Sequence, residues 1–381
     1  MKILITTDLF TVETNGVVTS VKNLSGELET RGHEVKILTL SEGFRSHKKD
    51  NVYYIRSAPV EVYPDVRMPL SYRHKYIKEL VDWNPDVIHS QCEFFSYFFA
   101  EYISKKTSAP IVHTYHTLYE QYASYVVPSK RLGNWVVKKA SKKRLKSAKT
   151  IIAPTKKVEI ALRGYEIDKD IRVVPSGISL EQHKNRITDE VRIARRKALG
   201  ISKDDIVLIN LGRLGTEKNL DELICFFKTI AADHKDLKMM LVGGGPAKDD
   251  LMKTAEKLEI SDRIIFTGMV KPDEVYVYYQ LGDIFVNAST SETQGLTYIE
   301  ASANGLPLVC RNDPCLSGVL LHGENGYLYN NEEEFTSYII SLAYDSEKRH
   351  TFGVRSEEIA QLFDKKSFGQ AVEAIYDSLA K

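Results

Sequence analysis

The sequence predicts an α/β protein built from two successive doubly wound domains, each a parallel sheet with helices on both faces. Short apolar, β-branched runs alternate with helical stretches along all 381 residues, the pattern of strand–helix–strand units. The alternation restarts after a turn-forming Pro-Ser-Gly segment at 175–177. The length also fits two or three domains. We therefore expect an N-terminal domain at 1–176 and a C-terminal domain at 177–381.

The N-terminal domain opens as strand, glycine-bearing loop, helix and strand. Residues 2–7 are apolar and β-branched, Asn15-Gly16-Val17 lies in a loop, and residues 17–30 have helical periodicity. Gly32 ends that helix, and residues 34–40 form the second strand. Further strands, with helices between them, are expected at 87–90, 111–114, 151–154 and 171–175.

The C-terminal domain repeats the pattern, starting with a charged helix at 189–199, a strand at 206–211 and a helix at 220–232. Later strands are expected at 237–242, 263–266, 284–287, 306–310 and 327–329. The last helix, about 366–381, is expected to pack back on the N-terminal domain. Nucleotide ligands of doubly wound sheets lie at the carboxyl ends of the strands, so functional residues are expected there.

Composition excludes several classes of protein. The four cysteines are scattered and none has C-x-x-C spacing, which argues against a disulfide framework, a zinc site and a redox dithiol. The start of the chain lacks a signal-peptide core, and no apolar run is long enough to span a bilayer. We expect an intracellular protein, in solution or on a membrane surface.

Charge is unevenly distributed between the two halves. Residues 1–200 carry a net charge of +12 and residues 201–381 carry −11, although the whole chain carries only +1. This asymmetry suggests that the two domains have different partners.

Glycine spacing argues against two common nucleotide-dependent functions. The first loop holds a single glycine, and the cluster Gly243-Gly244-Gly245 is followed by Pro246, so no G-x-G-x-x-G fingerprint of a nicotinamide enzyme is present. No P-loop sequence occurs either. The D-x-D pattern at 168–170, typical of metal-dependent transferases, lies in a polar segment that we interpret as a solvated loop before a strand.

Two motifs of the C-terminal domain suggest a site. The segment 212–219, GRLGTEKN, places Arg213 and Lys218 in a glycine-containing turn before a helix, where two cations and free N–H groups suit a diphosphate. An ordinary charged loop explains the segment equally well. Glu292 and Glu300, eight residues apart, are expected in a loop and in the following helix, so they need not act as a matched acid and base.

The whole string 287–307, NASTSETQGLTYIEASANGLP, resembles the donor-site signature of retaining glycosyltransferases of family 4, which have the GT-B fold of two Rossmann-like domains facing across a cleft. The resemblance covers essentially the whole chain. It includes Asn15-Gly16-Val17, VVPSGI at 173–178, GRLGTEKN, VGGGP at 242–246, FTG at 266–268 and NGYL at 325–328. One departure is the absence of the family's proline near Val12 or Glu13.

The resemblance implies a role for individual residues. Arg213 and Lys218 would neutralise the departing diphosphate, Glu292 would lie beside the donor sugar and His116 near the reacting sugar. For His116 a purely structural role is the alternative. The donor would further contact Gly16, Gly268, Val270, Gln294, Gly295, Leu296 and Glu300, with Glu300 on the ribose and the base read by main chain. Retention of configuration and independence of a metal are expected, with no cofactor and no assigned nucleophile.

The segment 129–150 is strongly basic and holds no acidic residue. Leu132, Val136 and Ala140 share a helical stripe, with Trp135 beside it, which suits an anionic membrane surface. A solvated basic face is the alternative, and nucleic-acid binding is disfavoured because no recognition module accompanies the charge. The candidate membrane-binding residues are Arg131, Trp135, Lys138, Lys139, Lys142, Lys143, Arg144 and Lys146. The aromatic run 94–99 could line a lipid groove or belong to the core.

The stretch HTYHTLYEQY at 113–122, with SETQGLTYIEA, looks most like bacterial diacylglycerol glucosyltransferases. The resemblance implies a hexosyltransferase that moves glucose from UDP-glucose to diacylglycerol on the inner face of the cell membrane. The same-class alternative transfers glucose or galactose to a glycolipid, polyprenyl-linked or polysaccharide acceptor. A non-catalytic sugar-nucleotide or membrane-binding module is disfavoured because all five implied side chains of the site are present, at His116, Arg213, Lys218, Glu292 and Glu300.

Overall fold

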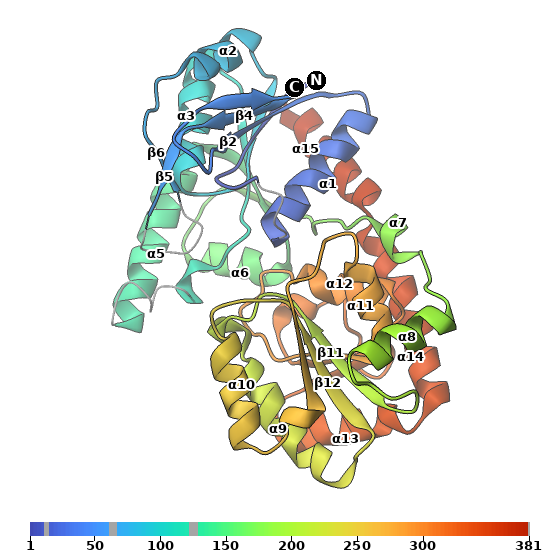
Figure 1. The fold of residues 1–381 in the computed structure, drawn as a ribbon. Helices are drawn as coiled ribbons and strands as arrows, with labels where there is room; N and C mark the ends of the chain where they lie inside the picture. Colours follow the sequence, from blue (N-terminus) through green and yellow to red (C-terminus); the bar gives the residue numbers. More distant parts are fainter. Residues whose placement is uncertain (11–14, 61–66, 122–128, 380–381) are drawn as a thin grey trace. The chain divides into compact units, whose positions relative to one another are not determined.

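A computed structural model describes residues 1–10, 15–60, 67–121 and 129–379 (Figure 1). The chain divides into two compact units. Unit 1 comprises Met1–Gly177 together with Lys365–Lys381, and unit 2 comprises Ile178–Asp364. The sequence places the boundary after residue 176, one residue before this division.

Unit 1 contains a parallel sheet with one antiparallel edge strand. The strand order reverses between β1 and β7, the arrangement of a doubly wound fold. From edge to edge the strands are β10 (Asp170–Val173), β9 (Ala148–Ala153), β8 (Ile111–Thr114), β7 (Val87–Ser90), β1 (Lys2–Thr6), β2 (Glu34–Leu40), β4 (Val52–Ile55) and the antiparallel β3 (His47–Lys49).

Helices cover both faces of this sheet because its central strands are apolar on both sides. In β1, Leu4 packs on one face while Ile3 and Ile5 pack on the other, and all three are fully buried. The first face is covered by α2 (Lys75–Trp83), α3 (Phe95–Thr107) and α6 (Lys156–Gly164). The second is covered by α1 (Gly16–Thr30) and α15 (Lys365–Leu379), which lie side by side in Figure 1.

Helix α15 belongs to unit 1 although the whole of unit 2 precedes it in the chain. Its buried Tyr376 donates or accepts a hydrogen bond at 2.6 Å with Nδ1 of His89, whose Nε2 lies 2.7 Å from Thr114 Oγ1. At the surface, Glu373 forms an ion pair with Arg31 (2.6 Å), and its Oε1 lies 2.7 Å from Nε2 of His33. Buried and exposed contacts together hold this last helix against the sheet and α1.

Unit 2 contains a six-stranded, fully parallel sheet whose order also reverses once, between β11 and β14. The strands, in spatial order, are β13 (Ile264–Gly268), β12 (Leu237–Val242), β11 (Ile206–Leu211), β14 (Ile284–Asn287), β15 (Leu308–Arg311) and β16 (Gly326–Tyr329). The doubly wound topology predicted from the sequence is therefore confirmed in both units.

The faces of the unit 2 sheet carry separate helix layers (Figure 1). Met239 and Leu241 of β12 pack on one side, whereas Met240 and Val242 pack on the other. One layer consists of α9 (Leu220–Asp233), α10 (Lys248–Lys257) and α13 (Glu332–Ala343). The opposite layer includes α11 (Val275–Leu281), α12 (Leu296–Ala303) and α14 (Ser346–Ala360). Two further helices precede the sheet, α7 (Leu180–His183) and α8 (Asp189–Ala198).

Three details differ from the sequence-based expectation. Gly16 is the first residue of α1 rather than a loop residue, because the Asn15 side chain caps the helix by accepting from Val18 N at 2.8 Å. Asp170 of the D-x-D pattern begins β10 instead of lying in a loop. The hairpin of β5 (Ser57–Pro59) and β6 (Arg67–Pro69) was not expected, because these strands are too short for a visible alternation.

Glycines allow the loops after β11 and β12 to pack directly on one another. Gly212 N donates to Val242 O at 2.9 Å and Leu214 N donates to Gly244 O at 2.9 Å. A Cβ atom on Gly243 would lie 2.0 Å from the carbonyl oxygen of Gly212, and the φ of Gly243 is +133°. No other residue type fits this position without moving backbone.

We predict that Gly243→Ala lowers the thermal stability of unit 2. The left-handed φ alone costs about 1–3 kcal/mol, and the clash with the Gly212 carbonyl adds to that. Differential scanning fluorimetry measures this effect. The control is Gly26→Ala in α1, where a Cβ meets nothing within 4 Å, so stability should be unchanged or slightly raised. Equal melting temperatures for the two variants would contradict this account.

Candidate active site

The carboxyl edge of the unit 2 sheet brings Lys218 and Glu292 together. Lys218 lies in the 3₁₀ turn Thr216–Lys218 after β11, and Glu292 lies in the loop after β14. Lys218 Nζ donates to Glu292 Oε1 at 2.5 Å, and both side chains are largely buried. Since β11 and β14 are the strands where the sheet order reverses, the pair occupies the place where doubly wound sheets bind their ligands.

Arg213 comes from the same loop as Lys218 but is more exposed. Its Nη1 lies 3.3 Å from Glu217 Oε1, an exposed contact four residues along the chain that contributes little to stability. The loop continues into α9, whose first-turn N–H groups and positive dipole end lie next to it. Two cations and a helix N-terminus thus gather within residues 213–220, as the GRLGTEKN segment predicted.

Glu292 and Glu300 lie in different surroundings, so the E-x7-E spacing does not describe a matched pair. Glu300 sits within α12 and accepts a hydrogen bond from the hydroxyl of Tyr279 at 2.9 Å. Burial raises the pKa of Glu300 above its usual value. Glu292, by contrast, is paired with the Lys218 cation. The two carboxylates can therefore serve different parts of one ligand.

Gly295 shapes the start of α12. Its φ is +71°, and a Cβ there would lie 2.3 Å from the ring of the buried Tyr298. Gly295 thus joins the loop that carries Glu292 to α12, whose first backbone N–H groups have no acceptor within the helix. Gln294 is buried and Leu296 half-buried. At the end of the edge strand β13, Gly268 has a φ of +74° with open space at its Cβ position, and Val270 follows it half-buried.

In unit 1, Gly16 and His116 both follow strands at the carboxyl edge of the sheet. A Cβ on Gly16 would meet nothing within 4 Å, so the packing of unit 1 does not itself require glycine there. His116 Nε2 lies 2.7 Å from Gln91 Oε1, and burial lowers the pKa of His116 to about 3. The imidazole is therefore neutral near pH 7 and can hydrogen-bond but does not supply a positive charge.

Sequence reasoning missed a buried polar cluster beside His116. Glu93 Oε1 lies 3.1 Å from His113 Nε2, and Glu93 Oε2 accepts from the hydroxyl of Tyr119 at 2.6 Å. Asp8, at the end of β1, is also buried, and burial raises its pKa to about 6. The available signal was the Asp that follows the first strand, since a charged residue directly after an apolar strand points to the ligand-binding edge.

The predicted basic helix forms as α5 (Lys130–Arg144). Leu132, Trp135 and Val136 point to the surface, with 52%, 52% and 43% of their areas exposed. Lys139 Nζ stacks 4.2 Å from the centroid of the Trp135 ring. The opposite side of the helix faces the core through Gly133 and Ser141. The stripe predicted from Leu132, Val136 and Ala140 is thus the exposed face.

The other basic candidates occupy three kinds of position. Lys138 and Lys142 both pair with Glu166, at 2.6 and 3.3 Å. Arg144 is half-buried, with its guanidinium 3.9 Å from the centroid of the Phe98 ring and 3.9 Å from Glu101. The remaining candidates, Arg131, Lys143 and Lys146, are exposed, with no ion pair to another described residue. Four of the seven basic candidates therefore place positive charge at the surface: Arg131, Lys143 and Lys146 without a described ion pair, and Lys139 stacked on Trp135.

The aromatic run 94–99 divides between core and surface. Tyr97 and Phe99 are buried, whereas Phe94 and Phe98 remain 38% and 40% exposed. Tyr72 contacts Phe98 edge-on with ring centroids 5.8 Å apart. Tyr97 and Phe99 therefore belong to the core, whereas Phe94 and Phe98 lie at the surface, and a lipid groove lined by this run stays a prediction.

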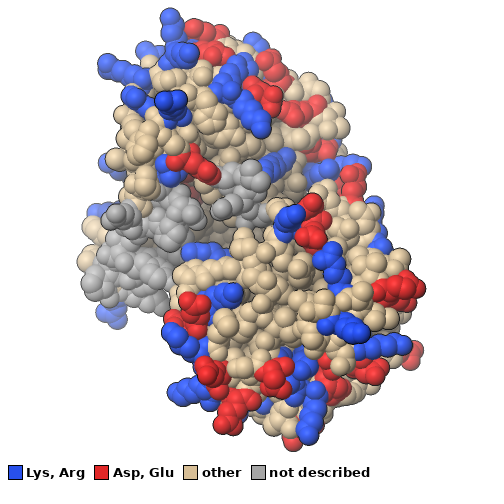
Figure 2. Space-filling model, in the orientation of Figure 1, with Lys and Arg blue, Asp and Glu red and all other residues tan. Residues whose placement is uncertain are grey.

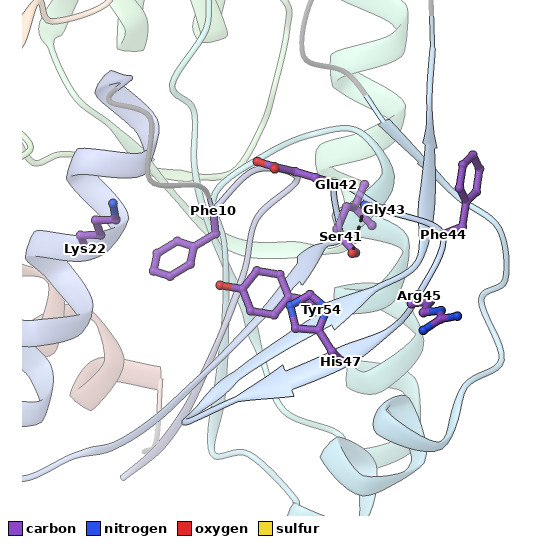
Figure 3. Close-up of a pocket in the computed structure, with 10 residues that line it drawn as sticks. Phe10, Lys22, Ser41, Glu42, Gly43, Phe44, Arg45, His47 and Tyr54 are labelled. Atoms are coloured by element: carbon purple, nitrogen blue, oxygen red, sulfur yellow. Dashed lines mark hydrogen bonds between the residues drawn. The ribbon is translucent and has the colours of Figure 1, made fainter. Parts of the chain in front are cut away.

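A separate pocket of about 780 Å³ lies in unit 1, beside α1 and the β2–β4–β3 edge (Figure 3). The rings of His47 and Tyr54 stack there with centroids 4.3 Å apart, and Tyr54 points toward Phe10 and Lys22 in Figure 3. None of the predicted site residues lines this pocket.

The described residues form neither a metal-binding cluster nor a helix that could span a membrane. Over residues 1–10, 15–60, 67–121 and 129–379, no group of three or more His, Cys, Asp or Glu side chains is arranged to hold a metal ion. Within the same residues, no helix has the length and apolarity needed to cross a bilayer. Figure 2 shows acidic and basic side chains interspersed over the visible face of unit 2, so that face carries no extended patch of one sign.

Comparison with known proteins identifies the family. Residues 191–358 match the model of the glycosyl transferases group 1, and residues 14–182 match that of glycosyltransferase family 4. The alpha-monoglucosyldiacylglycerol synthase of Streptococcus pneumoniae is 32% identical over 99% of this chain and 85% of its own length. The synthase of the same name from Acholeplasma laidlawii is 32% identical over 95% of this chain and 93% of its own length.

The chain belongs to glycosyltransferase family 4.

Solved structures agree with this assignment at the level of the fold. Sucrose-phosphate synthase from Thermosynechococcus elongatus matches with a TM-score of 0.79 and 19% identity, covering 99% of this chain and 98% of that one. The Anabaena protein HepE, in complex with UDP and glucose, matches with a TM-score of 0.77 and 17% identity, covering 99% and 100%. This glycosyltransferase therefore has the GT-B fold, with two Rossmann-like domains, as the sequence predicted.

Proposed function

We propose that this glycosyltransferase moves glucose from UDP-glucose to the free hydroxyl of diacylglycerol, forming an α-glucosyl-diacylglycerol. The observation that carries the proposal is the 32% identity, over nearly the whole chain, to two proteins named alpha-monoglucosyldiacylglycerol synthase. The donor is supported by the Lys218–Glu292 pair at the point where the unit 2 sheet reverses.

In this proposal the cations of unit 2 stabilise the leaving group. As the bond between the glucosyl carbon and the phosphate breaks, negative charge grows on the diphosphate of UDP. Lys218 and Arg213 place positive charge there, and the N-terminus of α9 adds its dipole. Because these groups are fixed by the fold, no metal ion is required, and treatment with a chelator should leave the rate unchanged.

The remaining donor-site residues hold the nucleotide and sugar. Glu300, held by Tyr279, receives the ribose hydroxyls, and Glu292 receives sugar hydroxyls. The amides of residues 294–296 and the backbone of 268–270 contact the distal phosphate, the sugar and the base. We assign no protein nucleophile, and we propose that the anomeric configuration is retained through departure and attack on the same face of the sugar.

Because the proposed acceptor is a lipid, we propose that the enzyme acts at the inner surface of the cell membrane. The exposed side of α5 combines apolar bulk at Leu132, Trp135 and Val136 with the cations Lys139 and Lys143, the composition of a helix that lies in an anionic interface. Arg144 links this helix to the exposed Phe98 of α3. Both features belong to unit 1, whose half of the sequence carries the positive charge.

Turnover on mixed vesicles tests the proposal. The protein is incubated with UDP-glucose and vesicles of diacylglycerol and anionic phospholipid, and the lipid products are followed by mass. A new lipid heavier by one hexose supports the proposal. Parallel samples contain glucosyl-diacylglycerol or a polyprenyl phosphate as acceptor, or UDP-galactose as donor. Product from one of those samples alone would replace the proposed acceptor or donor, and no product with any of them would contradict the proposal.

A further inference from the structure

We propose that Asp8 is the residue that receives the acceptor's hydroxyl: its free carboxylate oxygen accepts the hydrogen bond of the diacylglycerol hydroxyl at the carboxyl edge of the unit 1 sheet. The inference rests on the proposed function and assigns a residue to the acceptor side of the same reaction.

The position of Asp8 is fixed by one of its two oxygens. Asp8 lies two residues after the end of β1, and its Oδ1 accepts from the backbone N–H of Ser96 at 2.6 Å, in the first turn of α3. The second oxygen, Oδ2, is buried without a hydrogen-bond partner among the described residues. Only 8% of the Asp8 side chain is exposed. Helix capping accounts for Oδ1 and leaves Oδ2 without a function in the fold.

An unsatisfied carboxylate oxygen in a buried site destabilises the protein unless something binds it. Burial is the largest cause of the raised pKa of Asp8, and the nearby Glu93 carboxylate raises it further, whereas the hydrogen bond from the Ser96 backbone N–H lowers it. The other titratable groups that face Asp8 are the Cys92 thiol, from the segment after β7, and the Tyr72 hydroxyl, from the segment before α2. No cation in the described part of the chain pairs with Asp8.

A complementary donor lies on the adjacent strand end. Gln91 follows β7, and its backbone N–H donates to Thr6 O at 2.8 Å, which places it beside the end of β1. The Gln91 Oε1 contact with His116 leaves Nε2 of Gln91, fully buried, without a partner among the described residues. The buried atoms without a described partner at this edge therefore include one anionic acceptor, Asp8 Oδ2, and one amide donor, Gln91 Nε2.

The chemistry of diacylglycerol matches this pair of atoms. It has a single hydroxyl that can donate and two ester carbonyls that can only accept. The hydroxyl fits Asp8 Oδ2, and an ester carbonyl fits Gln91 Nε2, with His116 as the residue that positions the amide. The acyl chains of the lipid can contact apolar side chains at the N-terminal end of α3, which also holds Asp8. The exposed Phe94 directly precedes this helix, and the exposed Phe98 lies one turn further on.

Asp8→Asn separates this role from a structural one. Asn retains the Oδ1 that caps α3 but loses the charge, and losing a hydrogen bond to a charged group should slow transfer to diacylglycerol about 10- to 100-fold. Without a lipid acceptor, water can take its place and UDP-glucose is slowly hydrolysed. The rate of this hydrolysis by Asp8→Asn should stay within about twofold of that of the unmodified enzyme, because the donor residues belong to unit 2. The matched control is Asp86→Asn, since Asp86 also accepts from a backbone N–H at 2.6 Å, but at the amino edge of the sheet. Asp86→Asn should leave both rates unchanged.

Stability and pH give readouts that a structural role would not produce. The pKa of Asp8 is raised to about 6 in the folded protein from its usual value of 3.8, so its ionisation weakens the fold as pH rises through that window. Asp8→Asn should therefore keep or raise the melting temperature at pH 7.5. For the unmodified enzyme, the ratio of lipid transfer to hydrolysis should fall as pH drops through about 6, and the variant should lose this dependence.

Several outcomes would overturn the inference. Equal rates of lipid transfer for Asp8→Asn and the unmodified enzyme would show that Asp8 does not bind the acceptor. The same conclusion would follow if the variant still lost transfer relative to hydrolysis as the pH drops through about 6. A lower melting temperature with equal losses of transfer and hydrolysis assigns Asp8 to folding instead. If the unmodified enzyme makes no glucosyl-diacylglycerol at all, both the proposed function and the inference fail. If it makes this product and Asp8→Asn makes it equally fast, only the inference fails. The pH dependence of the unmodified enzyme needs no variant and is decisive where Asp8→Asn does not fold.

Discussion

Replacing Lys218 with Ala is expected to reduce kcat/KM for glucosyl transfer by about 10²–10³-fold while leaving the fold intact. This is the size of effect seen when one preorganised group that stabilises developing negative charge is removed. Lys218 lies at the reversal point of the unit 2 sheet, and its only described ion pair is with Glu292, 2.5 Å away. In the proposed donor site the substitution would leave Glu292 beside the diphosphate without a neutralising charge, so UDP binding should weaken as well.

The test combines kinetics with calorimetric UDP binding. Lys228→Ala, at an exposed position of α9, is the matched control and should change neither quantity. Glu292→Gln separates the two members of the pair, because it keeps the lysine for the phosphate but changes the group proposed to contact the sugar. It should therefore reduce kcat while UDP binding is retained. Unchanged turnover of Lys218→Ala would remove the assignment of this pair to the donor site.

The second large effect concerns the membrane. Arg131, Lys139 and Lys143 are exposed on α5 and have no ion pair to a described residue, unlike Lys138 and Lys142, which share Glu166. Each basic residue near an anionic surface contributes about 1 kcal/mol to binding. Replacing these three residues with Gln should therefore weaken binding to anionic vesicles by about 100-fold.

Vesicle co-sedimentation at two salt concentrations measures this effect. Binding of the unmodified protein should fall with added salt, because exposed charges are screened over about 8–10 Å near physiological ionic strength. The control variant carries the same change of net charge at exposed lysines of unit 2, Lys203, Lys228 and Lys257. Equal binding to neutral and anionic vesicles, or equal losses in both triple variants, would refute docking through α5.

The parts of this enzyme that sequence reasoning predicted are those governed by local patterns. The apolar runs predicted the central strands of both sheets because these strands are buried on both faces. The GRLGTEKN segment predicted the cationic turn because Arg213 and Lys218 lie five residues apart. The outward stripe of α5 followed from the helical spacing of Leu132 and Val136.

The parts it missed depend on contacts between distant segments or on weak local signals. Asp8, Glu93 and His113 come together only because β1, β7 and β8 are neighbours in the sheet, an order that the sequence does not state. The edge strand β3 is exposed at all three positions, so it has no apolar alternation to detect. The start of α1 predicted from the sequence, at residue 17, is one residue late because Asn15, rather than Gly16, caps the helix.

The measurement that tests the central claim most directly is the structure of the lipid product formed from carbon-13-labelled UDP-glucose. Nuclear magnetic resonance of the purified lipid identifies both the glycerol carbon that carries the sugar and the configuration at the labelled anomeric carbon. The account predicts glucose in α linkage at the glycerol position that bears the free hydroxyl of diacylglycerol. A β linkage, or glucose attached to any other lipid, would contradict it.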